Sequence, residues 1–494
     1  MTINPFIINK LIHSRYIALP ALCMMLTACK VGPDYHKPDT ALPKSWQSAP
    51  DDVNATGSII QHELAWWQGL HDPVLNQLMV QAAAGNWDVK VAGARISEAR
   101  SVHNAAVATL FPTGDLMASA SRQANQIGFP SGAPDSLKSA IKQPFNIFKT
   151  GFDASWELDL FGGHRREAES AKDAWEASII SRDDSLISVL AEVAHSYIDI
   201  RQYQAQLQIA KDTLTTDHEI CAITEQRLAL GDTAGLDVAK AQAQQEHDRT
   251  QLPYYQNLLT QAEFSLDVLL GEPPGTAHKR VGVMAVIPVA DKNIVLDAPA
   301  AVIAQRPDIR TAERKLAAAT AQQGVALAKF FPDISLTGFV GLFNTNAGSF
   351  LTAGSKSWSM GGNLLWPILS YGSLAANLHA TDAKQQEALA IYQKAIIAAL
   401  SDVERSFSAY SQQERFRQIL TKATDSDSSV YQIALGRYQV GLAAFLEVLD
   451  AQRRWYASQN QLALAKAQTA QDWVAVYKSL GGGWEIVKSH PPIP

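Results

Sequence analysis

The residues best suited to covalent chemistry are the three cysteines, Cys23, Cys29 and Cys221. They are too few and too far apart for a disulfide framework or a cysteine-based metal site. The sequence contains no HExxH, no GxSxG and no phosphate-binding GxxxxGK[ST] spacing. The acidic residues of the long predicted helices are spread out, and we do not expect them to be paired in a pocket. We therefore expect no enzyme activity, no cofactor and no resident metal.

Cys29 directly follows an apolar run near the start of the chain. The run covers residues 17–28, follows Lys10 and Arg15, and no acidic residue occurs before Asp34. It is shorter than the about 20 residues that a membrane-spanning helix needs. Its length is typical of the apolar region of a secretory signal peptide. We therefore expect residues 1–28 to be a signal peptide.

The last four residues of this segment, Leu-Thr-Ala-Cys, resemble the bacterial lipobox. The resemblance implies cleavage before Cys29, a diacylglycerol on its thiol and an acyl chain on its new amine. An ordinary buried cysteine is the alternative. Lys30 stands where an aspartate tends to retain such lipoproteins at the inner membrane. The pattern therefore predicts a lipid anchor in the outer membrane of a Gram-negative bacterium.

The charge and hydropathy of the mature chain exclude two classes of protein. Removal of Lys10 and Arg15 leaves 40 of the 42 basic residues against 48 acidic ones, which argues against a nucleic-acid partner. No later apolar run is long enough for a membrane helix. If the chain crosses a membrane, it must do so with strands.

The chain contains an internal duplication. RLALGDTAGLDVAKAQ (227–242) and RYQVGLAAFLEVLDAQ (437–452) lie 210 residues apart and are identical at 7 of 16 positions. ATLFP (108–112) matches AKFFP (328–332) at an offset of 220. Chance similarity between alanine- and glutamine-rich helices is the alternative, but the matches occur in the same order in both halves. We therefore predict two copies of one structural unit.

The duplication predicts how the chain is divided. We expect a signal peptide at 1–28, a lipid-anchored extended segment at 29–74, a first repeat at 75–271, a linker at 272–300, a second repeat at 301–480 and a tail at 481–494. Each repeat should contain a β-hairpin, a long helix and a second helix. These are predicted at 112–160, 164–230 and 233–270 in the first repeat, and at 332–369, 373–440 and 443–480 in the second.

The long helix of the first repeat has a seven-residue period. From Ile179 to Leu228, eight successive positions seven residues apart are apolar. This period predicts left-handed supercoiling against neighbouring helices. A helix of about 68 residues is about 100 Å long and needs an equally long partner. We expect 75–110 and 233–270 to supply it end to end, with Pro253 bending the second piece.

Both hairpin segments alternate apolar residues with polar or small ones. Phe152, Ala154, Trp156 and Leu158 show this alternation in the first repeat. The pattern and length suit tilted membrane strands, and a soluble hairpin packed on a helix is the alternative. Four strands cannot close a barrel, and an open edge in lipid leaves unpaired backbone groups. Two chains would give eight strands with a filled interior, whereas three would give twelve around an aqueous channel.

These features together resemble the TolC-like outer-membrane efflux factors, and more closely their lipoprotein branch. The specific motifs are VGPDYHKP (31–38), WELDLFGG (156–163), QRPDIR (305–310) and the paired glycine turns. The resemblance implies a mostly α-helical protein with a membrane β-barrel contribution. Three chains would form a homotrimer with a twelve-stranded barrel and an α-helical periplasmic tunnel. The tunnel would dock onto a periplasmic adaptor and an inner-membrane pump.

The resemblance also implies a periplasmic gate. Gly231 and Gly441 would mark the tips of the helical pairs. Leu446 and Asp450 match an apolar ring and a carboxylate ring at the aperture, and Glu447 matches a second carboxylate ring. A solvated helix face is the alternative for each of these side chains.

A tether between neighbouring coils is implied in the same region. Tyr438 matches its tyrosine and Asp237 its acidic partner, but Ala443 stands where an arginine is expected. A lock would therefore depend on Arg453 or Arg437. The copies also diverge here, because Lys240 and Ala243 occupy the positions of Asp450 and Arg453. This divergence fits one helical pair moving while the other stays fixed.

The predicted function is a passive exit duct for small molecules, served by a pump of the resistance-nodulation-division type. The alternatives are the duct of a type I protein secretion system and the duct of a metal-efflux system. A surface-anchored hydrolase and a trimeric coiled-coil scaffold are the alternatives from other classes. We expect QRPDIR to be structural and to order a belt midway along the tunnel.

Overall fold

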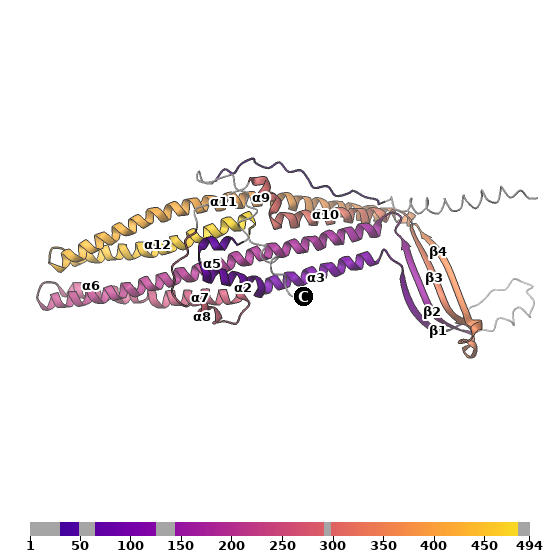
Figure 1. Ribbon diagram of the computed structural model, residues 1–494, viewed down its shortest axis with the longest axis horizontal. Helices are drawn as coiled ribbons and strands as arrows, with labels where there is room; N and C mark the ends of the chain where they lie inside the picture. Colours follow the sequence, from indigo (N-terminus) through magenta and orange to yellow (C-terminus); the bar gives the residue numbers. More distant parts are fainter. Residues whose placement is uncertain (1–29, 49–64, 125–143, 291–297, 483–494) are drawn as a thin grey trace, which may run out of the picture. The chain divides into compact units, whose positions relative to one another are not determined.

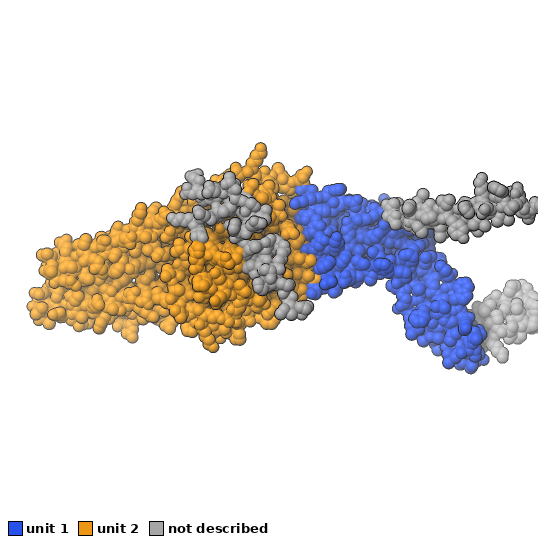
Figure 2. Space-filling model, viewed as in Figure 1, with its two compact units in different colours: residues 1–38, 97–176, 313–391 blue, residues 39–96, 177–312, 392–494 orange. Residues whose placement is uncertain are grey.

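The computed structural model describes residues 30–48, 65–124, 144–290 and 298–482. These residues belong to two compact units (Figure 2). Unit 1 comprises residues 1–38, 97–176 and 313–391, and unit 2 comprises residues 39–96, 177–312 and 392–494. Each unit therefore combines segments from both halves of the chain.

Unit 1 contains a four-stranded antiparallel sheet in the order β1-β2-β3-β4 (Figure 1). Its strands are β1 (Thr113–Gln123), β2 (Phe145–Leu158), β3 (Asp333–Asn344) and β4 (Lys356–Leu365). The register places Leu116, Phe152, Val340 and Trp358 in one row across the sheet, and each is more than 60% exposed. The predicted alternation therefore produces one apolar face.

The opposite face of the sheet is more polar but also carries aromatic rings, among them Phe339 and Phe343. Phe339 lies on this face but is only 8% exposed. Its ring covers the paired glycines Gly151 and Gly341, where an added Cβ would come within 2.9 and 2.8 Å of the ring. The Nζ of Lys149 lies 4.0 Å from the ring centroid. Glycine is required at this pair chiefly because an added Cβ would also lie 2.4 Å from the Val340 carbonyl oxygen at Gly151 and 2.1 Å from the Thr150 carbonyl oxygen at Gly341.

The helices of the two halves follow the same order. The first half has α2 (Pro73–Gly85), α3 (Trp87–Ala108), α5 (Gly163–Ala229), α6 (Gly235–Arg249), α7 (Gln251–Leu270) and α8 (Thr276–Val281), and the second has α9 (Pro299–Gln305), α10 (Pro307–Ala328), α11 (Tyr371–Gln439) and α12 (Phe445–Leu480). Short 3-10 turns are η2 (Trp66–Leu70), η3 (Ala347–Ser349), η4 (Ala353–Ser355) and η5 (Ile368–Ser370). No helix in the part of the chain described combines the length and apolarity needed to cross a membrane.

The long helices α5 and α11 contain 67 and 69 residues and lie where long helices are predicted. Within α5, Leu186, Val193 and Ile200 of the seven-residue series are fully buried. Ile179 and Leu228, at the two ends of the series, are 37% and 40% exposed. The seam is therefore closed by the chain's own helices in the middle and open at both ends.

Four predicted segments differ from the observed elements. The segment predicted as extended at 29–74 contains η2 and the first residues of α2. The helix predicted at 75–110 is interrupted between α2 and α3, and the linker predicted at 272–300 contains α8 and the start of α9. The helix predicted at 233–270 is broken at Thr250, three residues before Pro253. Proline is tolerated in the first turn of a helix because the N–H groups there have no partner. Thr250 keeps helical backbone angles (φ −64°, ψ −22°), so the interruption falls where Pro253 was expected to bend the helix.

The main core of unit 2 joins η2, α2, α5 and α12. Trp67, Leu75, Tyr197 and Trp473 are each no more than 2% exposed. The buried Arg201 of α5 completes this region. Its guanidinium donates to Tyr197 Oη at 2.8 Å and to the carbonyl oxygens at 281 and 283 at 3.1 and 2.7 Å. Arg201 therefore holds the segment after α8 against α5.

The duplication is visible as equivalent hydrogen bonds in unit 1. Trp156 Nε1 donates to the carbonyl of Leu110, and Trp366 Nε1 donates to the carbonyl of Phe330, both at 3.1 Å. Each tryptophan lies within two residues of the end of the second strand of its hairpin, and each carbonyl precedes a Phe-Pro step. The same side chain therefore closes the sheet end in both copies.

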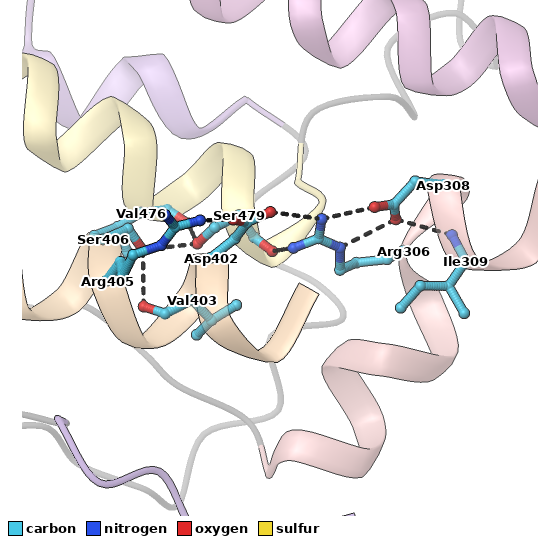
Figure 3. A network of polar contacts seen from close by, with 9 residues as sticks. All are labelled: Arg306, Asp308, Ile309, Asp402, Val403, Arg405, Ser406, Val476 and Ser479. Carbon is cyan, nitrogen blue, oxygen red and sulfur yellow. Dashed lines mark hydrogen bonds and ion pairs between the residues drawn. The ribbon is translucent and has the colours of Figure 1, made fainter. Parts of the chain in front are cut away.

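A second pair of equivalent contacts lies in unit 2, where QRPDIR is found. Arg306 donates from Nη1 to the carbonyl of Ser479 at 2.6 Å and binds both carboxylate oxygens of Asp308 at 3.1 and 2.7 Å (Figure 3). In the first copy, Asn86 Nδ2 donates to the carbonyl of Leu269 at 2.8 Å. Each contact ties the start of one helix to the end of another, so the motif acts as a clamp between α10 and α12.

Candidate functional site

Both helical pairs of unit 2 turn at a glycine. Gly231 has φ 81° and Gly441 has φ 80°, which L side chains rarely adopt. The N–H of each glycine donates to the carbonyl three residues before it, at 3.0 Å in both copies. The N–H of the next residue donates to the carbonyl five residues before it, at 2.9 Å for Asp232 and 2.8 Å for Leu442. These are the hydrogen bonds of a glycine-capped helix end, and they position α6 and α12.

Three of the predicted gate residues lie on the exposed face at the start of α12. Leu446 is 59% exposed, and Glu447 and Asp450 are exposed beside it. Asp450 forms an ion pair with Arg454 at 3.2 Å, which is an exposed contact worth less than about 1 kcal/mol. The opposite face of the helix is buried through Val448. The side chains of Leu446, Glu447 and Asp450 are therefore accessible to groups outside α12.

A groove of about 670 Å³ separates α6 from α12. Leu446 and Arg453 of α12 line it, whereas Glu447 and Asp450 do not. From α6, Lys240 lines the opposite wall. The structure of one chain thus divides the four predicted gate residues between the groove and the outer face of α12.

Arg453 links the two helical pairs across this groove. Its Nε and Nη2 donate to Gln244 Oε1 of α6 at 2.8 and 2.5 Å. Arg437 instead donates to the carbonyl of Leu442 in its own turn at 3.3 Å. Of the two arginines predicted for a lock, Arg453 is therefore the one that joins separate helices within the chain.

Tyr438 and Asp237 have different neighbours in the structure. Tyr438 is 3% exposed, and the guanidinium of Arg227 lies 4.6 Å from its ring centroid. Asp237 accepts from Thr233 Oγ1 at 2.8 Å and pairs with Lys240 at 3.7 Å. No hydrogen bond joins Tyr438 to Asp237 among the residues the structure covers. A tether between neighbouring coils stays a prediction.

Sequence reasoning missed a buried polar group beside the groove. Asp217 of α5 is 3% exposed, and its Oδ1 accepts from Gln452 Nε2 of α12 at 2.7 Å. Burial, with the neighbouring Asp248 of α6, raises the pKa of Asp217 to about 7. A signal was present in the sequence, because Asp217 lies between the seam residues Leu214 and Cys221, at a position where a coiled coil places an apolar side chain.

Cys29 lies outside the residues that the structure describes, but the segment that follows it is firmly docked in unit 1. Arg166, which is 1% exposed, donates to the carbonyl oxygens of Val31 at 3.0 Å and Gly32 at 2.9 Å. Gly32 has φ 92°, and an added Cβ would lie 2.5 Å from Gly324 Cα. The chain after the predicted anchor is therefore fixed to α5 and α10.

The family model described as "Outer membrane efflux protein" matches residues 78–272 and 298–482. The chain belongs to this family. The two matched stretches correspond closely to the repeats predicted at 75–271 and 301–480, so the model recognises each copy. Members of this family are outer-membrane channels, and the predicted family is confirmed.

Similar proteins extend over nearly the whole chain. The probable efflux pump outer membrane protein TtgC of Pseudomonas putida is 30% identical over 95% of both chains. The pyoverdine export outer membrane protein OpmQ of Pseudomonas aeruginosa is 30% identical over 95% of this chain and 97% of its own.

Solved structures agree with the fold. The outer-membrane channel OprN has a TM-score of 0.85 and 32% identity, over 92% of this chain and all of OprN. CmeC of Campylobacter jejuni has a TM-score of 0.84 over 92% of this chain and 95% of its own, and at 24% identity it supports the fold alone. The predicted fold class and the predicted function of an outer-membrane efflux channel are confirmed.

Proposed function

We propose that three copies of this chain form the outer-membrane duct of a tripartite efflux system. The sheet of unit 1 is the observation that supports this proposal. Its order leaves β1 and β4 as edge strands, and its apolar face is exposed in a single chain. In lipid, each unpaired backbone group at such an edge costs several kcal/mol. Three sheets of four strands would close into a twelve-stranded barrel wide enough for a channel.

An exposed apolar stripe on α11 supports the same assembly in unit 2. The stripe comprises Phe416, Ile419, Val430, Ile433 and Val440, each more than 50% exposed. They lie 3, 11, 3 and 7 positions apart, which places them at the two apolar positions of a heptad pattern. A second seam, which includes Val403, Tyr410, Tyr431 and Tyr438, is already buried within the chain. The exposed stripe is therefore suited to a helix of a neighbouring copy.

The cargo in this proposal is a small molecule. Among the relatives from Pseudomonas putida, one TtgC protein is named for toluene efflux and ArpC for antibiotic efflux, and OpmQ is named for pyoverdine export. All three names indicate small molecules rather than proteins. A periplasmic adaptor and an inner-membrane pump of the resistance-nodulation-division type would deliver the cargo, and the duct itself would be passive.

The proposal includes a lipid anchor at Cys29 and a gate at the helix tips. Arg166 holds the segment after Cys29 beside the start of α5, directly after β2. The first described residues after Cys29 therefore lie close to the end of β2, where Val31 N–H donates to the carbonyl of Phe161 at 3.1 Å. At the tips, Leu446 and Asp450 are exposed and available to meet their counterparts from other copies.

The duct is tested with the purified, acylated mature chain. We expect a trimer by mass in detergent, heat-modifiable migration on gels and conductance in planar bilayers. A monomer that passes no current would refute the proposal. Mass spectrometry of the Cys29→Ser variant should show loss of the lipid.

The gate has its own test in the same bilayers. Leu446→Ala and Asp450→Ala should both increase single-channel conductance, because each removes a ring from the constriction. Leu236→Ala is the matched control, since Leu236 is the equivalent residue of the first copy and is 63% exposed. Variants at Leu446 and Asp450 that conduct no better than wild type would refute the gate while leaving the duct intact.

A further inference from the structure

The charged side chains of the four strands are separated by face and by sign. Within the described strands, the register places every acidic residue on the more polar face of the sheet: Asp115, Asp153, Glu157 and Asp333. On the apolar face, which includes Phe152 and Trp358, the strands carry two charged side chains, Arg122 and Lys356. Both are basic and exposed. The apolar face therefore has a positive charge and no negative one.

Both cations lie at the same end of the sheet. Helices α3, α5, α10 and α11 all adjoin the end where β1 and β3 begin (Figure 1). Arg122 is the last but one residue of β1 and Lys356 is the first of β4, so both lie at the opposite end, where each hairpin turns. They also lie on the two edge strands. In the proposed barrel, β1 of one copy pairs with β4 of the next, and each junction between copies has an arginine and a lysine on neighbouring strands.

The level of Arg122 on the sheet matches the height of a membrane. Its partner in the register is Asn146, which lies ten positions along β2 from Trp156 at the helix end. Ten residues rise about 33 Å, which a strand tilt of about 40° reduces to about 25 Å. The apolar band of an outer-membrane barrel has this height. With Trp156 at one membrane interface, Arg122 therefore lies at the other, where the cost of a charge on the lipid face is small.

The β3–β4 turn extends the apolar face beyond the strands. Phe350 packs against Phe148 of the apolar face with the ring centroids 5.9 Å apart, and Leu351 beside it is 82% exposed. Ser355, which is 1% exposed, fixes the turn by donating to a backbone carbonyl within it at 2.8 Å. The turn therefore presents apolar side chains shortly before Lys356.

The two cations differ from the lysine on the opposite face. Lys149 lies 3.5 Å from the carboxylate of Asp153 and against the ring of Phe339. Among the described residues, neither Arg122 nor Lys356 has an acidic partner. Their charges are therefore available to an anionic group outside the chain.

We propose that Arg122, Lys356, Phe350 and Leu351 form a binding site for lipopolysaccharide, which we name the outer rim. The inference rests on the proposed barrel, because Arg122 of one copy and Lys356 of the next complete each site. The helices of the duct extend into the periplasm, so the hairpin end of the sheet faces the outer leaflet, whose anionic lipid is lipopolysaccharide. The guanidinium and the ammonium bind the phosphates of lipid A, and the two apolar side chains contact its acyl chains.

The test is native mass spectrometry of the purified trimer in detergent, titrated with lipid A. We expect one lipid A at each junction between copies. Arg122→Gln and Lys356→Gln should each weaken the binding about fivefold, and the double variant more than about tenfold. Lys149→Gln is the matched control, because it removes the same charge from the opposite face of the same sheet. If that variant does not assemble, Lys422→Gln at an exposed site on α11 replaces it.

The chemistry of the lipid supplies a second comparison. Lipid A without its phosphates should bind the wild-type trimer no better than intact lipid A binds the double variant. Phosphatidylglycerol should bind at least about tenfold more weakly than lipid A, because it has fewer acyl chains and a single phosphate. Equal binding of phosphatidylglycerol and lipid A would overturn lipopolysaccharide as the occupant.

Assembly is measured on the same samples. The double variant should still form a conducting trimer, since both side chains are exposed. If it bound lipid A as tightly as wild type, the site would be disproved. A conducting wild-type trimer that binds no lipid A refutes the outer rim alone, whereas a chain that never forms a trimer refutes the proposed duct.

Discussion

The tips of the two repeats share one turn but differ in how they are packed. Gly231 and Gly441 have the same backbone angle and the same capping hydrogen bonds. Three residues before the glycine, however, the second copy has Tyr438, which is 3% exposed, where the first has Leu228, which is 40% exposed. Four residues after it, Phe445 is buried where the first copy has Gly235.

This difference shows that a duplicated turn can be retained while its attachment to the protein changes. The rings of Tyr438 and Phe445 lie 5.7 Å apart, and both belong to the buried cluster of the second tip. Buried aromatic rings contribute most of the packing energy at such a site. We infer that the second tip depends on side-chain packing, whereas the first depends mainly on its turn.

The largest expected effect is at the aromatic anchor of the second tip. Tyr438→Ala should cost about 3 kcal/mol of local stability, because it removes a buried ring and leaves a cavity. Leu228→Ala should cost less than about 1 kcal/mol, because that side chain is already partly exposed. Hydrogen exchange of peptides spanning each turn measures the free energy of opening. Equal effects at the two tips would contradict the comparison.

The clamps at the other end of the repeats offer an intermediate effect. Arg306→Ala should cost about 2–3 kcal/mol, because it leaves the Ser479 carbonyl without its donor and the Asp308 carboxylate with the N–H of Ile309 but no guanidinium. Asn86→Ala should cost about 1–2 kcal/mol, since a neutral amide and a helix cap are lost. Thermal unfolding of the two variants at one pH makes the comparison. A larger loss of stability for Asn86→Ala would mean that the charged clamp does not stabilise the second copy more than the neutral contact stabilises the first.

The smallest effect should be the same in both copies. Gly231→Ala and Gly441→Ala should each cost about 1–2 kcal/mol, because alanine is strained at a positive φ. Nothing lies within 4 Å of an added Cβ at Gly231, and only Arg227 lies near one at Gly441, at 3.8 Å. The cost is therefore a property of the backbone alone. Hydrogen exchange at the two turns should show matching losses, and a difference above about 1 kcal/mol would indicate a tertiary role for one glycine.

Much of the fold could be predicted from short-range patterns. The glycine turns, the alternation around Phe152 and Trp358, and the seven-residue series through Leu186 each depend on residues close in sequence. The interruption beside Pro253 could be predicted as well, because a proline has no N–H to continue the helical hydrogen bonds. Gate residues such as Leu446 came from family resemblance, and the structure adds that Leu446 lines the groove while Asp450 does not.

The sequence by itself determined the duplication, the strands, the long helices and their turns, because backbone preference and periodicity are local. Only the tertiary structure decided which polar residues are buried and what they meet. Asp217 and Gln452 are 235 positions apart in the chain, and nothing in either neighbourhood specifies the other. The clamp of Arg306 on Ser479, 173 positions away, was hidden for the same reason. Burial and contact depend on how distant segments pack, and that packing brings together polar residues that are far apart in the chain.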